Sequence, residues 1–193
     1  MIKRITTLML LCSFFGLTST VWSQSLAVKS DLLSNAFFSP NVSFEQSLGG
    51  RFSVDVSLHY NPFGSKESLK RWKHWLVQPE LRLWACHPFS GHFLGIHLLA
   101  GEYNIADTDL PAGLYKGTKS WRYEGSVMGA GLSYGYQWIL SPRWGLEATF
   151  GLGYVRASYD RYRCAHCGEK LSSGHKNYLG PTKAAVSVVY MLW

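Results

Sequence analysis

Apolar and polar residues alternate along several stretches of this chain, and the alternation is strictest between residues 52 and 61. There Phe, Val, Val, Leu and Tyr take every second position, and Ser, Asp, Ser, His and Asn take the positions between them. Because successive side chains of a β-strand point to opposite faces, a period of two separates the two kinds of residue. The stretch therefore predicts a strand with one apolar and one polar face.

The same pattern recurs over most of the chain after residue 24, and no stretch shows an apolar stripe with the 3.6-residue period of a helix. We expect eight strands near residues 25–34, 39–48, 51–61, 72–84, 92–103, 122–138, 143–157 and 181–193. A chain of 193 residues has room for one domain of this size. The predicted fold class is therefore all-β, as an eight-stranded antiparallel up-and-down barrel.

Short and long connections alternate between the predicted strands. The short ones are Gly49-Gly50, Pro88 to Gly91 and Ser141-Pro142. The others cover 62–71, 104–121 and 158–180, with a shorter one near 36–39. Barrels of the bacterial outer membrane have short periplasmic turns and longer outer loops. The pattern thus predicts that both termini lie on the periplasmic side.

Alternation alone does not tell which face points outward, since a soluble lipocalin-like carrier has the same period with an apolar interior. Several segments reach the roughly 9 to 11 residues that a tilted membrane strand needs. Aromatic residues gather near the segment ends, as in the girdles of membrane barrels. They are Tyr60, Trp72, Trp75, Trp84, Tyr103, Trp121, Trp138, Trp144, Tyr154 and Tyr190. The polar faces carry Asp55, Glu80, Arg82 and Glu147 among Gly and Ser, which suits a narrow interior. We therefore favour a transmembrane barrel and keep the soluble periplasmic carrier as an alternative.

The composition agrees with an apolar outer surface. Charged residues make up 16% of the chain, against about 25% in typical soluble domains. The net charge of +7 is spread over predicted loops and does not form one basic stripe. We therefore expect no nucleic-acid partner and favour contact with acidic lipid headgroups or anionic surface polymers.

The first residues have the order of a secretory signal. Met1 to Arg4 is basic, Ile5 to Thr18 is apolar, and Val21-Trp22-Ser23 is suited to cleavage before Gln24. We expect residues 1–23 to be a signal peptide and residues 24–193 to form the barrel domain, located in the cell outer membrane. No later run of 18 apolar residues predicts a membrane helix.

Four stretches, 72–84, 91–104, 161–168 and 177–183, resemble a family of short outer-membrane barrels of unknown function from Gram-negative gut and oral bacteria. Members are often encoded beside fimbrial (fimbrillin-type) genes. The resemblance implies a structural or accessory role in surface (fimbrial) assembly or envelope integrity. Outer-membrane lipid, and fimbrial or other surface proteins at the long loops, are the partners it implies. It implies no mechanism, because no activity is established for the family.

Cys164 and Cys167 form the most conspicuous candidate site, in the last predicted long loop. With His175, and with His166 as a further donor, they offer the thiolate and imidazole ligands of a zinc site, although a second cysteine pair is missing. A redox pair would need a strand-to-helix context, which this loop lacks. We favour a Cys164–Cys167 disulfide that fixes the loop and leaves Cys86 as a lone thiol. No cofactor is then expected, and zinc belongs to the alternative.

A set of hydroxyl, imidazole and carboxylate groups gives an enzymatic alternative. Asp55 and His59 share the polar face of one strand, and Ser57, Glu80 and His97 are expected on the same side of the sheet. Serine, histidine and an acid are the groups of a lipid-modifying hydrolase or acyltransferase. However, no serine lies in a G-x-S-x-G turn, and a narrow interior has to be filled by paired polar groups in any case. We therefore expect a non-enzymatic barrel without catalytic residues.

Two further segments have plain structural interpretations. The basic and aromatic stretch 66–75 could hold lipopolysaccharide phosphates, but we favour an outer loop that runs into the aromatic girdle. Successive members of the set Gly125, Gly129, Gly131 and Gly135 lie two or four positions apart, so they share one face of the strand, and we expect them to relieve crowding inside a small barrel. Eight strands leave an interior that side chains just fill, so an open pore is not expected.

Overall fold

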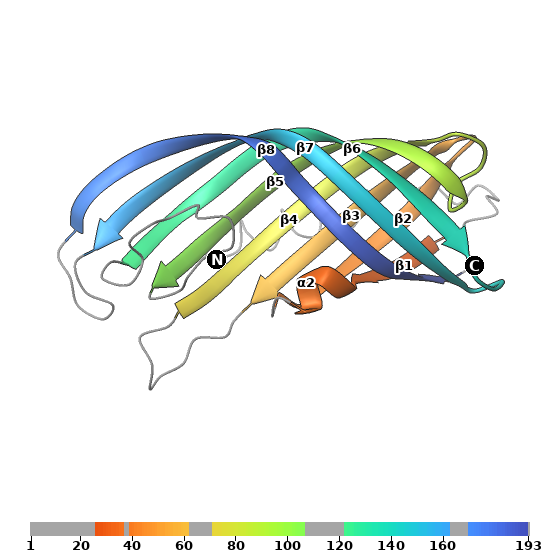
Figure 1. Cartoon of the computed structure of the whole chain (residues 1–193), viewed down its shortest axis with the longest axis horizontal. Helices are drawn as coiled ribbons and strands as arrows, with labels where there is room; N and C mark the ends of the chain where they lie inside the picture. The colour runs from red at the N-terminus through yellow and green to blue at the C-terminus, as the bar shows by residue number, and fades with distance from the viewer. Residues whose placement is uncertain (1–25, 37–38, 62–70, 107–121, 163–169, 193) are drawn as a thin grey trace, which may run out of the picture.

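Figure 1 shows the computed structural model of the chain, which describes residues 26–36, 39–61, 71–106, 122–162 and 170–192. The elements are β1 (Leu26–Asp31), α2 (Leu32–Ala36), β2 (Asn41–Gly49), β3 (Phe52–Asn61), β4 (Arg71–Trp84), β5 (Gly91–Ala106), β6 (Arg122–Ile139), β7 (Trp144–Tyr162) and β8 (Lys170–Met191). The prediction of an all-β chain with eight strands is confirmed. In the described parts of the chain, no helix has the length and apolar character needed to cross a membrane.

Each strand pairs antiparallel with the next one in sequence, and β1 pairs with β8, so the single sheet closes into a barrel (Figure 1). The connections after β2, β4 and β6 are short and lie at the same end of the barrel. The turn after β2 uses Gly49 and Gly50 with φ angles of 95° and 60°. Only glycine adopts such angles without strain, which is why a Gly-Gly pair predicts this hairpin.

The apolar face of the sheet points outward and the polar face points inward. On β5 the side chains of Leu94, Ile96 and Leu98 are 61%, 59% and 57% exposed, whereas His97 between them is fully buried. The same inversion holds on β3, where Ser53, Asp55 and Ser57 are buried. A water-soluble barrel with an apolar core has the opposite arrangement.

The first strand is shorter than predicted because a helix begins at residue 32. The Asp31 carboxylate accepts hydrogen bonds from the backbone N–H of Leu33 (3.0 Å) and of Ser34 (3.2 Å). These bonds satisfy amides at the first turn of α2, as an N-terminal cap does. The alternation between residues 25 and 34 conceals this cap, because Asp31 also fits the polar face of a strand.

The predicted loop at 158–180 is wrong. β7 continues to Tyr162 and β8 already begins at Lys170, so that Ser158, for example, pairs with His175. The glycines of this stretch and the adjacent Pro181 resemble turn signals, but the paired strands accommodate them. Thr182 of β8 is the extra residue of a bulge, because Pro181 pairs with Leu152 of β7 and Lys183 pairs with Gly151. Strand length therefore rises from 6 residues in β1 to 22 in β8, and β6, β7 and β8 extend far beyond β1 (Figure 1).

Aromatic side chains close the interior at the short-turn end. Trp84 was predicted to belong to the girdle but is fully buried inside, where its ring centroid lies 4.7 Å from that of Phe93 and 6.1 Å from that of Phe89. Its indole N–H donates to Ser53 Oγ (2.8 Å). Trp84 lies at an inward position of β4, so the position along the strand was predicted correctly and the face was not.

Candidate functional site

The most distinctive group in the barrel is a cluster of charged side chains in its interior. It lies next to Trp84, Phe89 and Phe93, the aromatic plug that closes the short-turn end. The cluster contains Lys29, Glu45, Asp55, Glu80, Arg82, Glu147 and Lys183. Six different strands supply them, and each side chain is at most 7% exposed. Burial of a charge is costly unless the charge is paired and hydrogen-bonded, so their mutual contacts decide whether the barrel is stable.

Arg82 is the centre of this charged cluster. Its Nη1 lies 2.9 Å from Glu45 Oε2 and 2.9 Å from Glu147 Oε2. Its Nη2 lies 3.4 Å from Asp55 Oδ2 and 3.3 Å from Glu80 Oε2. The guanidinium carbon also lies 4.4 Å from the centroid of the Phe93 ring. A planar group with five N–H donors is suited to contact several carboxylates at once, which a lysine in this position could not do.

Two lysines complete the cluster from the strands that close the barrel. Lys29 of β1 forms ion pairs with Glu45 and Glu147, and Lys183 of β8 forms them with Glu80 and, at 3.8 Å, with Asp55. The cluster thus joins three cations to four carboxylates across the interior.

Each carboxylate of the cluster also accepts a hydrogen bond from a hydroxyl group. The pairs are Ser53 to Glu45, Ser57 to Asp55 (3.1 Å), Ser133 to Glu80 and Thr149 to Glu147 (2.9 Å). These hydroxyls lie on the inward faces of their strands beside the acids. Their presence explains why the polar faces combine serine and threonine with charge.

Glycines make room for the cluster in the barrel wall. A Cβ atom on Gly95 would lie 2.1 Å from Glu80 Oε1. One on Gly131 would lie 2.7 Å from the His97 ring, and one on Gly135 would lie 2.3 Å from the Phe93 ring. Real Cβ atoms do not approach other atoms so closely, so the predicted relief of crowding by these β6 glycines is confirmed.

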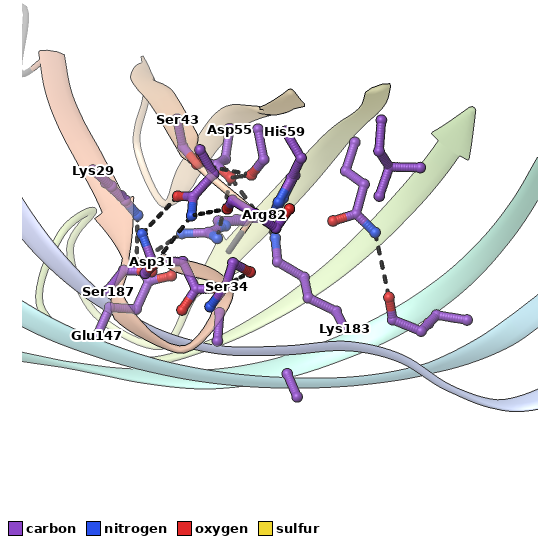
Figure 2. A pocket seen from close by; sticks show the side chains of 18 of the residues that line it. Lys29, Asp31, Ser34, Ser43, Asp55, His59, Arg82, Glu147, Lys183 and Ser187 are labelled. Atoms are coloured by element: carbon purple, nitrogen blue, oxygen red, sulfur yellow. Dashed lines mark hydrogen bonds and ion pairs between the residues drawn. The ribbon is translucent and has the colours of Figure 1, made fainter. Parts of the chain in front are cut away.

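A polar cavity of about 230 Å³ lies beside the cluster, toward the end of the barrel with the long connections. Figure 2 shows Asp31, Asp55, His59 and Lys183 among the side chains that line it. Hydroxyl and amide groups fill the spaces between the charges, and His74 Nε2 lies 2.9 Å from Ser39 Oγ in the same wall. The cavity is therefore a polar space of a few water molecules in size.

The structure brings together part of the set considered for an enzyme. Asp55, Ser57 and His59 all line the cavity. The Ser57 hydroxyl donates to Asp55 and accepts a hydrogen bond from Ser43 (2.9 Å). Among the described residues its hydrogen bonds thus join it to a hydroxyl and a carboxylate, whereas the serine of a Ser–His–acid triad is hydrogen-bonded to an imidazole.

The other members of that set have separate contacts. Glu80 is held by Arg82 and Lys183, and His97 Nε2 lies 2.9 Å from Thr182 Oγ1. These contacts fill the interior and orient the side chains. They do not assemble a Ser–His–acid chain in the described part of the molecule.

The zinc alternative stays a prediction. Cys164, His166 and Cys167 lie outside the described residues, and the favoured disulfide is likewise a prediction. His175 is exposed on β8, where its Nδ1 lies 3.0 Å from Ser158 Oγ, so it belongs to a strand and not to a loop. Within the described ranges no group of three or more His, Cys, Asp or Glu side chains is arranged to hold a metal ion. Cys86 is an exposed free thiol.

A second, more open cavity of about 580 Å³ lies farther out along the strands. Tyr60, Trp75 and Glu102 contribute to its wall, and the Trp75 indole N–H donates to Glu102 Oε2 (3.1 Å). Of the basic segment 66–75, residues 71–75 belong to β4 and the first five lie outside the described residues.

Four of the seven charges in the cluster were predicted as interior groups, whereas Lys29, Glu45 and Lys183 were not named among them. Lys29 and Glu45 occupy inward positions of alternating strands, so the same period of two was sufficient to find them. Lys183 follows the bulge at which the pairing with β7 shifts, and the shift hides its face from a simple count.

Comparison with known proteins places the chain in a family. Residues 6–192 match a family model described as a protein of unknown function (DUF3575). No curated protein and no solved structure is similar enough to match the chain. Because the family match covers nearly its whole length, the chain belongs to the DUF3575 family of proteins of unknown function.

Proposed function

We propose that this protein is a barrel of the outer membrane that acts without catalysis, as a structural or accessory factor in surface assembly or envelope integrity. This proposal rests on one observation: the outer surface of the barrel wall is apolar and its inner surface is charged. Large apolar side chains such as Leu94, Met128 and Leu132 are each more than half exposed. A soluble monomer seldom exposes a continuous apolar surface of this extent, whereas lipid would cover it.

The dimensions of the apolar wall support this proposal. On β3 the outward positions run from Phe52 to Tyr60, which is about 27 Å along the strand at a rise of roughly 3.4 Å per residue. At the tilt of roughly 35–45° that strands of outer-membrane barrels have, this length gives roughly 19 to 22 Å of height, somewhat less than the apolar band of about 25 Å in such barrels. Exposed aromatic residues lie at both ends of the wall, with Tyr60 and Trp75 paired at one end and Trp138 and Trp144 near the other. Amphipathic rings favour the two membrane interfaces.

An apolar groove on the outer wall gives further support. It has a volume of about 340 Å³ and is lined mainly by Phe52, Leu81, Leu83, Leu94, Ile96 and Leu132. An acyl chain of a membrane lipid has the chemistry to fill it. A soluble carrier would instead need an apolar interior, and here the interior is charged.

The interior supports a structural role over transport or catalysis. The aromatic plug and the charged cluster fill the short-turn end, so they favour a closed barrel over an open pore. The Ser57 hydroxyl donates to the Asp55 carboxylate, which is itself paired with Arg82 and Lys183, and this arrangement favours a structural over a nucleophilic role for Ser57. In this proposal the signal peptide at residues 1–23 directs export, and fimbrial or other surface proteins contact the outer end of the barrel.

Cell fractionation and heat modification test the membrane proposal. We expect the protein in the outer-membrane fraction, and we expect faster migration in a detergent gel before boiling than after, because a folded barrel resists detergent. Recovery in the soluble periplasmic fraction would favour the carrier and contradict the proposal.

Deletion of the gene tests the non-enzymatic role. We expect unchanged lipid A and phospholipid profiles together with fewer assembled surface fibres. Both His59→Ala and His97→Ala should restore fibre assembly as well as the wild type does. A lipid profile that changes on deletion, and that the wild type restores but His59→Ala does not, would instead identify an enzyme.

A further inference from the structure

Among the described residues, one edge of the outer half of β8 has no neighbouring strand, and we call it the open edge. β8 pairs with β7 along almost its whole length, but β1 pairs with it only from Ser187 to Met191. Just before this contact, the backbone N–H of Val186 points away from β7 and donates to Asp31 Oδ1 (3.0 Å). Over residues 172–180 no described strand lies on that side of β8. Figure 1 shows the strand continuing well beyond β1 there.

This edge is regular enough to accept another strand. From Ser172 to Gly180 the residues of β8 pair one to one with β7, without a bulge and without a proline. Pro181 and the adjacent bulge lie between this stretch and the part held by β1. Proline, bulges and short length are the usual means of protecting a sheet edge, and here they end where the open stretch begins. Every second backbone amide and carbonyl of the stretch is thus directed to the open side.

The charge of the hairpin determines what kind of strand fits. Over residues 156–162 and 170–180 of the hairpin the chain has four Lys and Arg residues and one acidic residue, Asp160, and β8 itself has no acidic residue. Lys183, farther along β8, is buried in the charged cluster and does not contribute to this edge. A second copy would bring an equally basic edge against this one, which like charges oppose. An acidic segment would be attracted to it.

We propose that the β8 edge at residues 172–180 binds an extended, carboxylate-bearing segment of a partner protein by β-strand addition. The main chain supplies the hydrogen bonds, and side chains beside the edge select the sequence. Leu179, which is 81% exposed, and Asn177 lie on the outer face of β8 at this edge. They offer one apolar and one polar contact to alternate residues of the incoming strand. This inference goes beyond the proposed function, because the edge is open whether or not the barrel is in a membrane.

Binding of synthetic peptides to the full chain in detergent micelles tests the proposal. The first peptide has about ten residues and alternates Val or Thr with Glu, the second is identical but N-methylated at consecutive central amides so that both of its edges lack donors, and the third has Lys in place of Glu. We expect the first peptide to bind and to slow hydrogen exchange over residues 172–180. The N-methylated peptide should bind at least about tenfold more weakly, because neither of its edges has the main-chain donors.

Two substitutions of Asn177 test whether charge at the edge affects peptide binding while the barrel stays folded. Asn177→Glu should weaken binding of the acidic peptide about threefold, and Asn177→Lys should strengthen it by a similar factor, as exposed charge pairs do. Ser126→Glu is the matched control, because Ser126 is exposed on β6 between paired strands. It should leave binding unchanged. Unaltered migration before boiling shows that each variant is folded.

Several results would overturn the proposal. One is equal binding of the N-methylated peptide, and another is unchanged exchange of residues 172–180 when the acidic peptide is saturating. Protection of these residues in the chain alone, together with a dimeric mass by light scattering, would assign the edge to a second copy. Protection by phosphatidylglycerol vesicles but not by the peptide would assign it to lipid.

Discussion

Arg82 Nη1 lies 2.9 Å from Glu147 Oε2, although the two residues are 65 positions apart and their strands, β4 and β7, are not neighbours in the sheet. The contact therefore crosses the interior of the barrel and does not run along its wall. Ordinary strand pairing fixes each strand only relative to the next one. Contacts across the interior fix opposite sides of the barrel relative to each other, and Arg82 makes several of them.

Removal of Arg82 should be strongly destabilising. Arg82→Ala leaves four buried carboxylates without their shared cation, and loss of one partner of a buried ion pair costs about 3–5 kcal/mol. We expect a large fall in the free energy of unfolding, measured by urea titration of the refolded protein in micelles. Arg51→Ala is the control, because Arg51 is exposed and its side chain, among the described residues, contacts the Ala85 carbonyl at 3.5 Å and no carboxylate. Equal stability of the two variants would show that the cluster does not stabilise the barrel.

A methyl group on Gly95 should disturb the cluster through the wall. Its Cβ would lie 2.1 Å from Glu80 Oε1 and 2.4 Å from Ser133 Oγ. Overpacking of this kind costs about 1–3 kcal/mol, so Gly95→Ala should lower the urea midpoint. Gly145→Ala is the comparison, because the nearest atom to its Cβ would be 3.0 Å away, and its effect should be clearly smaller. A Gly95→Ala variant as stable as the wild type would contradict the packing described above.

A charge on the outer wall should interfere with membrane insertion. Leu132 is 65% exposed on β6, and Leu132→Arg should cost about 2–4 kcal/mol if this position lies near the middle of a bilayer. The measurement is the folded fraction after refolding into phosphatidylcholine vesicles. Ser126→Arg, farther out on the same strand, should have a much smaller effect. If Leu132→Arg folds as efficiently as the control, the wall does not contact lipid.

Loss of the Asp31 carboxylate should loosen α2 and the start of the β1–β8 contact together. Asp31 accepts hydrogen bonds from Leu33 and Ser34 in α2 and from Val186 in β8. Asp31→Ala should cost about 1–2 kcal/mol, as loss of a helix cap does, and should speed hydrogen exchange at both places. Asn35→Ala, at an exposed position of α2, should leave exchange at Val186 unchanged. Faster exchange in α2 alone would limit the role of Asp31 to capping.

The strands could be predicted because their period of two survives in the sequence almost everywhere. β3 and β5 show the pattern most clearly, since exposed apolar residues such as Leu58, Leu94 and Ile96 alternate with buried polar ones such as Ser57 and His97. Their orientation was predicted from strand length, aromatic positions and the charges on the polar faces, and the aromatic criterion misplaced Trp84. An aromatic ring fits both an interface and a plug, so the residue type alone does not decide between them.

The interior contacts could be predicted only in part. The period of two identifies Asp55 and Glu80 as inward residues, but it does not show that one guanidinium contacts both of them. That contact depends on the stagger between strands, which pairing registers set and composition does not. The extent of the last hairpin was missed for a related reason, because the glycines and Pro181 within paired strands look the same in sequence as those in turns.

The short contact between β1 and β8 affects the order in which the barrel folds and unfolds. Its pairs, such as Ala27 with Met191, join the two ends of the described chain, whereas every other strand pair is a hairpin of sequence neighbours. Loop-closure entropy makes such a long-range contact the slowest to form. Among the described residues five pairs join β1 to β8, and four join β1 to β2. The strands from β2 to β8 can therefore form as successive hairpins. We expect the pairing of β1 with β8 to close the barrel last during folding and to break first during unfolding.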